Sequence, residues 1–476
     1  SDILGYHRMQ AGTVPAISSN DTRNTGDALM GRLFYSFDKK ILLTASVRRD
    51  GYSAFGVSNP HATFPSVALG WVFSEEPFFK FPAMDFGKLR VSWGQNGNRD
   101  IGMYAALAEM KTDQYIYQTL NGNIDLSNSV YVSTMANKDL KWETTSSFNF
   151  GLDFGFLDSR ISGNIDVYKM VTSDLLINRS LTETIGFGEV MANLGEVQNT
   201  GFELSLRTLN IDAKNFQWNT TFNFSLNRNK VNHLYGDYEN VLDDNGNVIG
   251  RKEMDDIKNE WFIGKDISSI WTYNVIGVWQ ENEAEQAAEY GLRPGDMKIK
   301  DVDGNKIYDN NDKEFIGYKT PRFRWTLRNE FTLFKNWNLS FMLYSYWGHK
   351  APYQRAKHFE AGTLTKTNYF KILYWTAENP TNEYARLYSD DKNIGANFYR
   401  SLSFIRLDNI SIGYTVPKSF LNKFKIEGMN IYGTIKNVGC WAPDWEYYDP
   451  EAYNADSPNT VSSTNRTYTL GVNVTF

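Results

Sequence analysis

The stretch that decides the fold is TYTLGVNVTF, residues 467–476, in which apolar residues alternate with polar or small ones. Successive side chains of a β-strand point to opposite faces, so this alternation gives one apolar face and one polar face. The apolar face carries Tyr468, Leu470, Val472, Val474 and Phe476. In a soluble sheet that face would pack on a core, whereas in a membrane barrel it meets lipid and the polar face lines a wet lumen.

The same alternation recurs along the chain. In RFRWTLRNEFTLF (322–334), five large apolar residues share one face, and Arg322, Arg324 and Arg328 lie on the other. An arginine-rich face suits a lumen wall better than the inside of a soluble sandwich. The other alternating segments span 33–37, 42–49, 64–73, 88–93, 146–156, 160–170, 201–209, 215–226, 270–279, 337–347, 404–416 and 430–437. With the terminal segment these make fourteen visible strands, and a change of phase near Asp408 indicates a β-bulge.

Composition narrows the class of protein. Aromatic residues make up 15% of the chain, which fits both a barrel with aromatic girdles and a large glycan-binding β protein. The net charge of −6 and the lack of Lys/Arg blocks argue against nucleic acid as a partner. Cys440 is the single cysteine, so an intrachain disulfide is excluded. No apolar run is long enough for a transmembrane helix, and the first residues do not form a signal peptide.

The connections between the alternating segments are unequal. Those at 38–40, 157–159, 210–214 and 335–336 are tight, whereas 95–139, 179–197, 228–267, 281–321, 348–402 and 438–465 are long. Short periplasmic turns opposite long extracellular loops are typical of outer-membrane barrels. The strand before 38–40 and the terminal strand would then both run toward the periplasm, which requires an odd number of strands. We therefore expect a fifteenth strand within 228–321, and we expect residues 1–28 to be an extracellular loop segment preceding a barrel portion at 29–476.

Several motifs together resemble one known family. They are FDKKILLTASVRRDGYSAFG (37–56), FPSVALGWVFSEEPFF (64–79), KLRVSWGQNGN (88–98), NKDLKWETTSSFNFGLDFGFLDSRISGNIDVYK (137–169), NLGEVQNTGFELSL (193–206), PGDMKIKDVDGNKIYDNND (294–312), FIRLDNISIGYTVPK (404–418) and YTLGVNVTF (468–476). In their order along the chain they resemble the SusC/RagA family of TonB-dependent outer-membrane transporters.

The resemblance implies an all-β fold, a transmembrane antiparallel barrel in the Gram-negative outer membrane. Members have 22 strands around a plug, a size class with a plugged lumen. This chain would supply about 15 strands as the C-terminal part, because the family's plug and TonB-contacting segment lie N-terminal to it. The implied partners are a SusD-like lipoprotein lid, TonB through the N-terminal part, membrane lipid, and an oligosaccharide or peptide ligand. Pairs of the two subunits can also dimerise.

One loop has the pattern of a metal site. In DVDGNKIYDNND, the oxygen-bearing residues stand at positions 1, 3, 5, 9 and 12 of a calcium-type loop, and Ca²⁺ or Mg²⁺ prefers such ligands. They are Asp301, Asp303, Asn305, Asp309 and Asp312. Against this, position 6 is Lys306 instead of glycine, and position 12 is Asp instead of Glu. An Asx-rich turn without metal explains the same residues. Just before this loop, ENEAEQAAEYG predicts a short helix that ends at Gly291.

The last long loop reads CWAPDWEYYDPE and is richer in aromatics than the family pattern. Its Trp441, Trp445, Tyr447 and Tyr448 could contact ligand or partner, and packing against neighbouring loops is the alternative. The final Phe476 resembles the terminal aromatic residue by which outer-membrane barrels are recognised for insertion. An aromatic residue of the interfacial girdle would occupy the same position in the sequence.

Catalysis has little support, since the five histidines are scattered and no H-E-x-x-H, G-x-S-x-G or P-loop pattern occurs. We therefore expect no enzyme. The sequence favours the C-terminal portion of a SusC-like importer over two alternatives. A passive porin should close as a barrel by itself, and a soluble glycan-binding β protein should lack a uniform aromatic-rich outer face.

Overall fold

The computed structural model describes residues 21–180, 189–243, 245–353, 373–389, 394–445, 449–452 and 464–476. Predicted Tyr447 and Tyr448 lie outside these residues. None of the helices in the described ranges is long and apolar enough to span a membrane.

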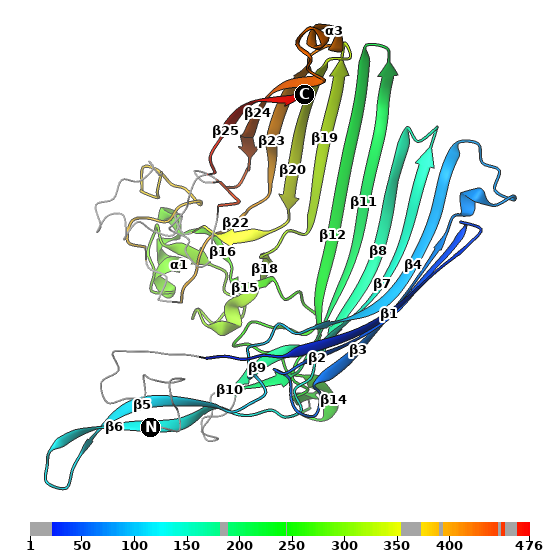
Figure 1. The fold of residues 1–476 in the computed structure, drawn as a ribbon. Coiled ribbons are helices and arrows are strands. Elements are labelled where there is room, and N and C mark those ends of the chain that lie inside the picture. Colours follow the sequence, from blue (N-terminus) through cyan, green and yellow to red (C-terminus); the bar gives the residue numbers. More distant parts are fainter. Residues whose placement is uncertain are drawn as a thin grey trace.

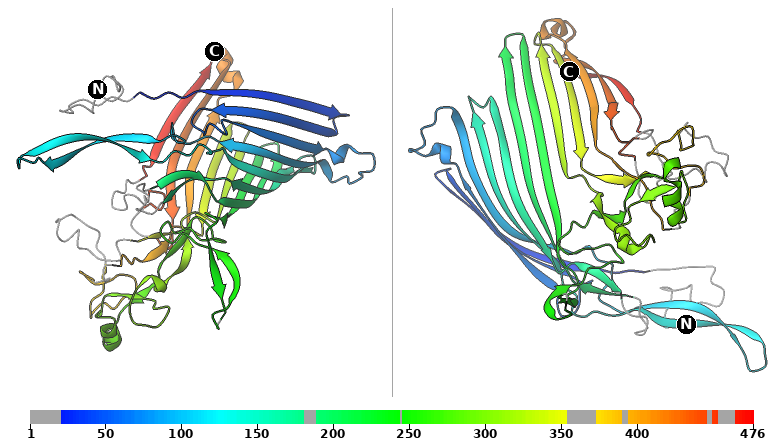
Figure 2. Two further views of the ribbon diagram at one scale, coloured as in Figure 1. Left: turned by 90° about the horizontal axis from the view of Figure 1, so that it is seen from below. Right: turned by 180° about the vertical axis from the view of Figure 1, so that it is seen from behind.

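The dominant element is one curved sheet of thirteen antiparallel strands (Figures 1 and 2). Its strands, in spatial order, are β1 (Gly26–Phe37), β2 (Ile41–Tyr52), β3 (His61–Trp71), β4 (Met84–Asn98), β7 (Glu143–Phe156), β8 (Ile161–Ser173), β11 (Glu196–Ala213), β12 (Phe216–His233), β19 (Phe323–Leu333), β20 (Trp337–Trp347), β23 (Phe404–Thr415), β24 (Gly428–Trp441) and β25 (Thr467–Thr475). Each strand pairs with the next wall strand along the chain. In the described residues β1 and β25 are the two edges, so the sheet forms an open wall.

The two faces of this wall differ as the alternation predicts. One register row crosses β25, β24, β23, β20 and β19 through Leu470, Gly433, Ile412, Leu339 and Phe331. On this outer face large apolar side chains stay uncovered, and Leu470 is 83% exposed. Such exposure is costly in water but favourable against lipid. The inner face carries the hydroxyl, amide and charged side chains of the same strands.

Tight turns gather at one end of the wall, which we call the turn rim. They lie at 38–40, 157–160, 214–215 and 334–336, and residues such as Asp38 (φ 50°) and Lys335 (φ 69°) adopt the left-handed conformation there. Two longer connections, with η2 (Phe73–Glu75), α3 (Lys418–Leu421) and η7 (Asn422–Phe424), also reach this rim. The end of β25 lies at the same rim in Figure 1, as the predicted strand directions require.

Within the described ranges the wall has thirteen strands, so the predicted number of about 15 is wrong for this part of the chain. The alternating segment 270–279 is not a wall strand. It forms β15 (Ser269–Tyr273), which pairs with β18 (Lys313–Tyr318), and β16 (Val275–Val278), which pairs with β17 (Met297–Ile299). Bulges between Ile270 and Trp271 and between Val275 and Gly277 interrupt its regular register. Of the fourteen alternating segments, thirteen are wall strands in the described residues. The number of wall strands is therefore odd, as expected, without an additional strand within 228–321.

The opposite end, the loop rim, carries the long connections. They contain the hairpins β5 (Glu109–Gln118)–β6 (Ile124–Thr134) and β13 (Tyr238–Leu242)–β14 (Val248–Glu253), and the pairs β9 (Leu176–Ser180)–β10 (Glu189–Asn193) and β21 (Lys350–Pro352)–β22 (Tyr399–Ser401). The predicted helix is present as η4 (Glu281–Glu283) and α1 (Ala284–Glu289), followed by Gly291 at φ 66°. Several predicted boundaries shift: the wall starts at Gly26, and β4 and β24 extend into the segments taken as loops 95–139 and 438–465.

Three of these connections fold together into one hydrophobic cluster, which we call the loop-rim core. Its buried residues come from 273–299, 351–402 and position 445, and Met297 and Ala396 have no exposed surface. The predicted bulge near Asp408 is also present, because the register shifts between Leu407 and Asn409. It lies in β23 at the approach to this core. These three connections therefore form one packed structure and are not separate loops.

Candidate functional site

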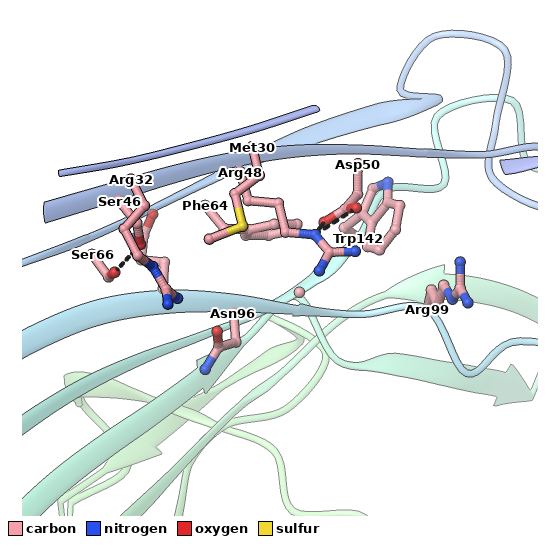
Figure 3. A pocket seen from close by; sticks show the side chains of 12 residues that line it. Met30, Arg32, Ser46, Arg48, Asp50, Phe64, Ser66, Asn96, Arg99 and Trp142 are labelled. Atoms are coloured by element: carbon pink, nitrogen blue, oxygen red, sulfur yellow. Dashed lines mark hydrogen bonds and ion pairs between the residues drawn. The ribbon is translucent and has the colours of Figure 1, made fainter. Parts of the chain in front are cut away.

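A basic hollow of about 460 Å³ lies on the wall near the loop rim, along β1 to β4 (Figure 3). Arg32, Arg48, Arg99 and Asp50 line it, so its formal charge is +3 − 1 = +2. Arg32, Arg48 and Asp50 belong to the inner face, since Leu43, Ala45 and Val47 of β2 occupy the opposite, apolar face. The hollow therefore opens toward the lumen side of the wall.

The arginines of this hollow are not equivalent. Arg48 is held by Asp50, whose two carboxylate oxygens accept hydrogen bonds from its Nε at 2.8 and 2.7 Å. Arg32 and Arg99 form no ion pair within the described ranges. Their guanidinium carbons lie 5.5 Å from the Phe34 ring and 5.4 Å from the Tyr52 ring, respectively. Among the described residues, two cationic groups of the hollow are thus without a carboxylate partner and could bind an anion.

An aromatic cluster forms one side of the hollow. Trp142 stacks on Phe55 with ring centroids 4.7 Å apart and meets Phe64 edge-on at 5.7 Å. Gly97 permits this approach, since a Cβ there would come within 2.0 Å of the Phe64 ring. Phe64 and Trp142 are both buried, so they are rigid walls of the hollow. This site is not visible in the sequence because its lining residues lie up to 112 positions apart, from Met30 to Trp142. Only Arg48 and Asp50 show a local pattern, since they share one face of β2.

A second hollow of about 340 Å³ lies on the inner face of β8, β11, β12 and β19 and has the opposite charge. It is lined by Asp166, Glu203 and Arg324, a formal charge of −2 + 1 = −1. Next to it, Arg90 binds both Asp153 and Asp166 at 2.9 Å. The basic character of the first hollow is therefore not a general property of the inner face.

The structure separates the predicted aromatic residues of the last loop. Trp445 is buried in the loop-rim core, where its ring meets Tyr353 at 5.1 Å, so it is placed for loop packing and not for ligand contact. Trp441 ends β24 and is 56% exposed, with its ring 6.5 Å from Trp347 on the outer face. This position suits an aromatic girdle.

The same loop is held by a buried arginine that sequence analysis did not single out. Arg406 of β23 donates to Glu451 at 2.7 Å and to Asn437 at 2.5 Å, and it also binds Asp449. Burial alone would raise the pKa of the Asp449 carboxyl, but the hydrogen bonds from Arg406, the Glu451 amide and Thr464, together with the charge of Arg406, lower this pKa below its usual value. The two acidic residues of the YDPE motif thus dock the loop onto the wall.

The metal-like loop brings three of its five predicted ligands together. Carboxylate oxygens of Asp301, Asp303 and Asp312 lie within 4.8 Å of one another. Asp309 instead caps η5 (Asn310–Asp312) by accepting from the Asn311 amide, and Asn305 bonds Asp303.

Main-chain donors already bind the carboxylates of this group. Asp312, which is fully buried, accepts the amides of Val302 and Asp309. Burial would raise the pKa of Asp301, but the amides of Lys306 and Gly304 lower it below its usual value. These bonds fit an Asx-type turn. Asp301 Oδ2 accepts from both the Lys306 amide and the Tyr290 hydroxyl, whereas the other carboxylate oxygens of the group keep a second lone pair for a cation. The Ca²⁺ or Mg²⁺ site stays a prediction, now limited to Asp301, Asp303 and Asp312.

Three histidines have distinct surroundings in the described part of the chain. Burial and nearby Arg324 lower the pKa of His349 to about 4, so this histidine is neutral at pH 7. His61 lies 3.2 Å from Asp27, and His233 lies 3.2 Å from Glu253 at a separate location. Phe476 is 86% exposed and follows β25 at the turn rim, and its role as an insertion signal remains a prediction.

Comparisons with known proteins agree with this architecture. The family model described as "TonB dependent receptor-like, beta-barrel" matches residues 4–438. The chain is 30% identical to TonB-dependent receptor P3 of Formosa agariphila over 99% of its own length and 48% of that protein. It is 29% identical to TonB-dependent receptor SusC of Bacteroides thetaiotaomicron, covering 96% of this chain and 44% of that protein.

A solved structure has the same fold. The RagAB peptide transporter matches 95% of this chain and 48% of its own chain, with a TM-score of 0.74 and 24% identity. The chain therefore spans about half the length of the relatives that it matches.

Proposed function

Since this chain belongs to the family of TonB-dependent receptor β-barrels of the outer membrane, we propose that it is the lumen wall and loop portion of a SusC-like importer. The complete transporter would take up oligosaccharides or peptides with a SusD-like lipoprotein over its mouth. The part of the family's length outside this chain would supply the plug and the contact with TonB. We place the loop rim outside the cell and the turn rim in the periplasm.

The observation that carries this proposal is the packed loop rim. Three connections that are far apart in sequence share one buried core, with Tyr353, Trp375 and Trp445 among its members. Arg406 docks the last of them onto the wall. A passive pore needs only an open mouth, whereas a lid that captures cargo needs a rigid platform to close against. The packed rim favours the lidded importer.

The outer face argues against the soluble alternative. Tyr468, Leu470 and Phe476 are 70–86% exposed at one edge of the wall, and Leu29 and Leu33 are 76% and 59% exposed at the other. Between the edges, apolar side chains of the same face, such as Phe331 and Leu339, are partly exposed. A soluble protein rarely exposes so large a contiguous apolar area. A lipid environment removes this cost, which supports a barrel wall over a glycan-binding β protein.

The β5–β6 hairpin is the element that we assign to the lid contact. It projects from the loop rim away from the wall (Figure 1). On one face of the hairpin Met110 pairs with Val132, Thr112 with Val130 and Ile116 with Leu126, and the polar pair Gln114–Asn128 lies between them. Ile116 is nevertheless 72% exposed and Leu126 52%. A two-stranded hairpin is marginally stable alone, so a partner protein that covers this face would stabilise it.

Intact mass spectrometry of the complex extracted in detergent from the outer membrane tests the proposal. We expect a longer form of this chain, or a companion N-terminal fragment, together with a lipidated protein. Uptake of the cargo should stop when a protonophore collapses the gradient that drives TonB. A chain that purifies without a partner and transports without the gradient would favour a porin.

The hairpin variant Ile116→Asp tests the lid contact separately. Burying an unpaired carboxylate is unfavourable, so the variant should lose most of the co-purifying lipoprotein while its amount in the membrane stays unchanged. Val248→Asp on the exposed β13–β14 hairpin is the matched control, since Val248 is also 58% exposed. Equal loss of the lipoprotein in both variants, or in neither, would contradict the assignment.

A further inference from the structure

We propose that the basic hollow along β1 to β4 is a cargo subsite for an anionic group, a carboxylate or a sulfate ester, carried on a sugar or peptide. This inference rests on the proposed importer function and adds a substrate class to it. Arg32 and Arg99 would each bind such a group, with the fixed Arg48–Asp50 pair between them. In Figure 3, Arg32 and Arg99 lie on opposite sides of that pair.

Some arginines of the inner face have a carboxylate partner: Arg90 is paired with two aspartates, Arg328 with Glu330 and Arg406 with two acidic residues. Arg207 and Arg324 have no ion pair in the described part of the chain. The same holds for Arg32 and Arg99, which have aromatic rings as neighbours and line one hollow together. Guanidinium groups bind carboxylates and sulfates through paired N–H donors, so an external anion would complete their coordination.

The volume and lining of the hollow indicate a ligand larger than a free ion. Its volume of about 460 Å³ lies within the range of small-molecule sites. Phe64 and Trp142 give it a rigid apolar side, and the paired hydroxyls of Ser46 and Ser66, 2.7 Å apart, add a polar surface. A ligand with an apolar surface beside a negative charge matches this lining. An acidic sugar and an acidic peptide side chain both have that chemistry.

The position of the hollow fits cargo passage. It faces the lumen side and lies next to the segment from 99 to 142 that leads into and out of the β5–β6 hairpin. Arg99 and Trp142 stand at the two ends of that segment. Cargo that entered beneath a lid docked on the hairpin would meet this hollow at the start of its path.

Binding to the complete transporter with its co-purified partner, measured by calorimetry, tests the proposal. The probes are trigalacturonate with its methyl ester, and an acidic hexapeptide with its Glu→Gln counterpart. We expect the wild type to bind at least one acidic probe more tightly than its neutral counterpart. Arg32→Gln and Arg99→Gln should each weaken that acidic probe about tenfold and leave the neutral one unchanged. If the variants weaken binding of trigalacturonate, the cargo anion is that of a glycan; if they weaken binding of the acidic hexapeptide, it is that of a peptide.

Arg207→Gln is the control. Arg207 is exposed, belongs to the inner face of β11 and lies outside the hollow, so its loss should leave both probes unaffected. Acidic probes that bind no more tightly than neutral ones, or an equal loss in Arg207→Gln, would overturn the proposal. The proposal would also be overturned if Arg32→Gln and Arg99→Gln lowered the melting temperature of the protein without probe but left its preference for acidic probes unchanged. The two arginines would then pair with a carboxylate of the protein itself. Gradient-dependent uptake without acidic selectivity would refute this inference and leave the proposed importer intact.

Discussion

Arg406→Gln should release the last long loop from the wall. The Arg406 side chain is 3% exposed and binds Asp449 and Glu451, and Glu451 also accepts from the Tyr344 hydroxyl at 2.5 Å. Removing one partner of a buried charged group costs about 3–5 kcal/mol, because the remaining charges stay desolvated. If this cost falls on docking of the loop, the undocked population rises about a hundredfold to a few thousandfold.

Limited proteolysis measures that population. Cleavage between 441 and 466 by thermolysin, with the site identified by mass, should accelerate by a similar factor when opening is fast relative to cleavage. Arg328→Gln is the matched control, since Arg328 also pairs with a carboxylate on the inner face but is 47% exposed. An exposed pair contributes about 0–1 kcal/mol. Cleavage of Arg406→Gln no faster than that of Arg328→Gln would refute the reasoning.

The same contact predicts a pH dependence. The pKa of Asp449 is depressed in the folded state, so its stabilising effect is present above the unfolded value of 3.8 and is lost as pH falls through the lower folded value. Proteolytic protection of the loop should therefore persist at pH 5 and decline below about pH 4. Adding Asp449→Asn and Glu451→Gln to Arg406→Gln should restore part of the protection, because no unpaired carboxylate then remains.

Three further predictions concern the residues singled out by the sequence. Trp445→Ala should destabilise the loop-rim core by about 3–5 kcal/mol, and Trp441→Ala should change its thermal unfolding little; similar melting shifts would contradict this placement. If a cation binds the metal-like loop, Ca²⁺ should slow its proteolysis and Asp303→Asn should abolish that effect; EDTA-treated wild-type protein without any response to Ca²⁺ would exclude the site. Phe476→Ala should lower the amount of folded barrel in the outer membrane, measured by heat-modifiable gel mobility, and an unchanged amount would leave Phe476 a girdle residue.

Much of the wall could be predicted because its information is local. The alternation in 467–476 defines which face Leu470 and Val472 occupy, and tight turns such as 38–40 define the direction of the next strand. Even the bulge at Asp408 is visible as a change of phase. A period of two needs no knowledge of distant partners, since a strand puts alternate residues on opposite faces wherever it pairs.

The segment 270–279 shows where this reasoning stops. Its alternation equals that of a wall strand, yet β15 and β16 pair within the loop rim. Pairing depends on which strand lies alongside, and that choice depends on the packing of residues about 20 to 50 positions away. The strand count was wrong for this reason.

The candidate site was decided by tertiary structure to a still greater degree. An aromatic segment such as CWAPDWEYYDPE has the same sequence pattern whether it forms a ligand site or packs in a loop core. Only the contact with Tyr353 shows that Trp445 belongs to the loop-rim core. The basic hollow joins Arg32, Arg99 and Trp142 from three separate segments. The sequence by itself determined the two faces of the wall, because strand geometry is local. Only the fold decided which charges are paired among the described residues, because pairing requires groups far apart in the chain to meet.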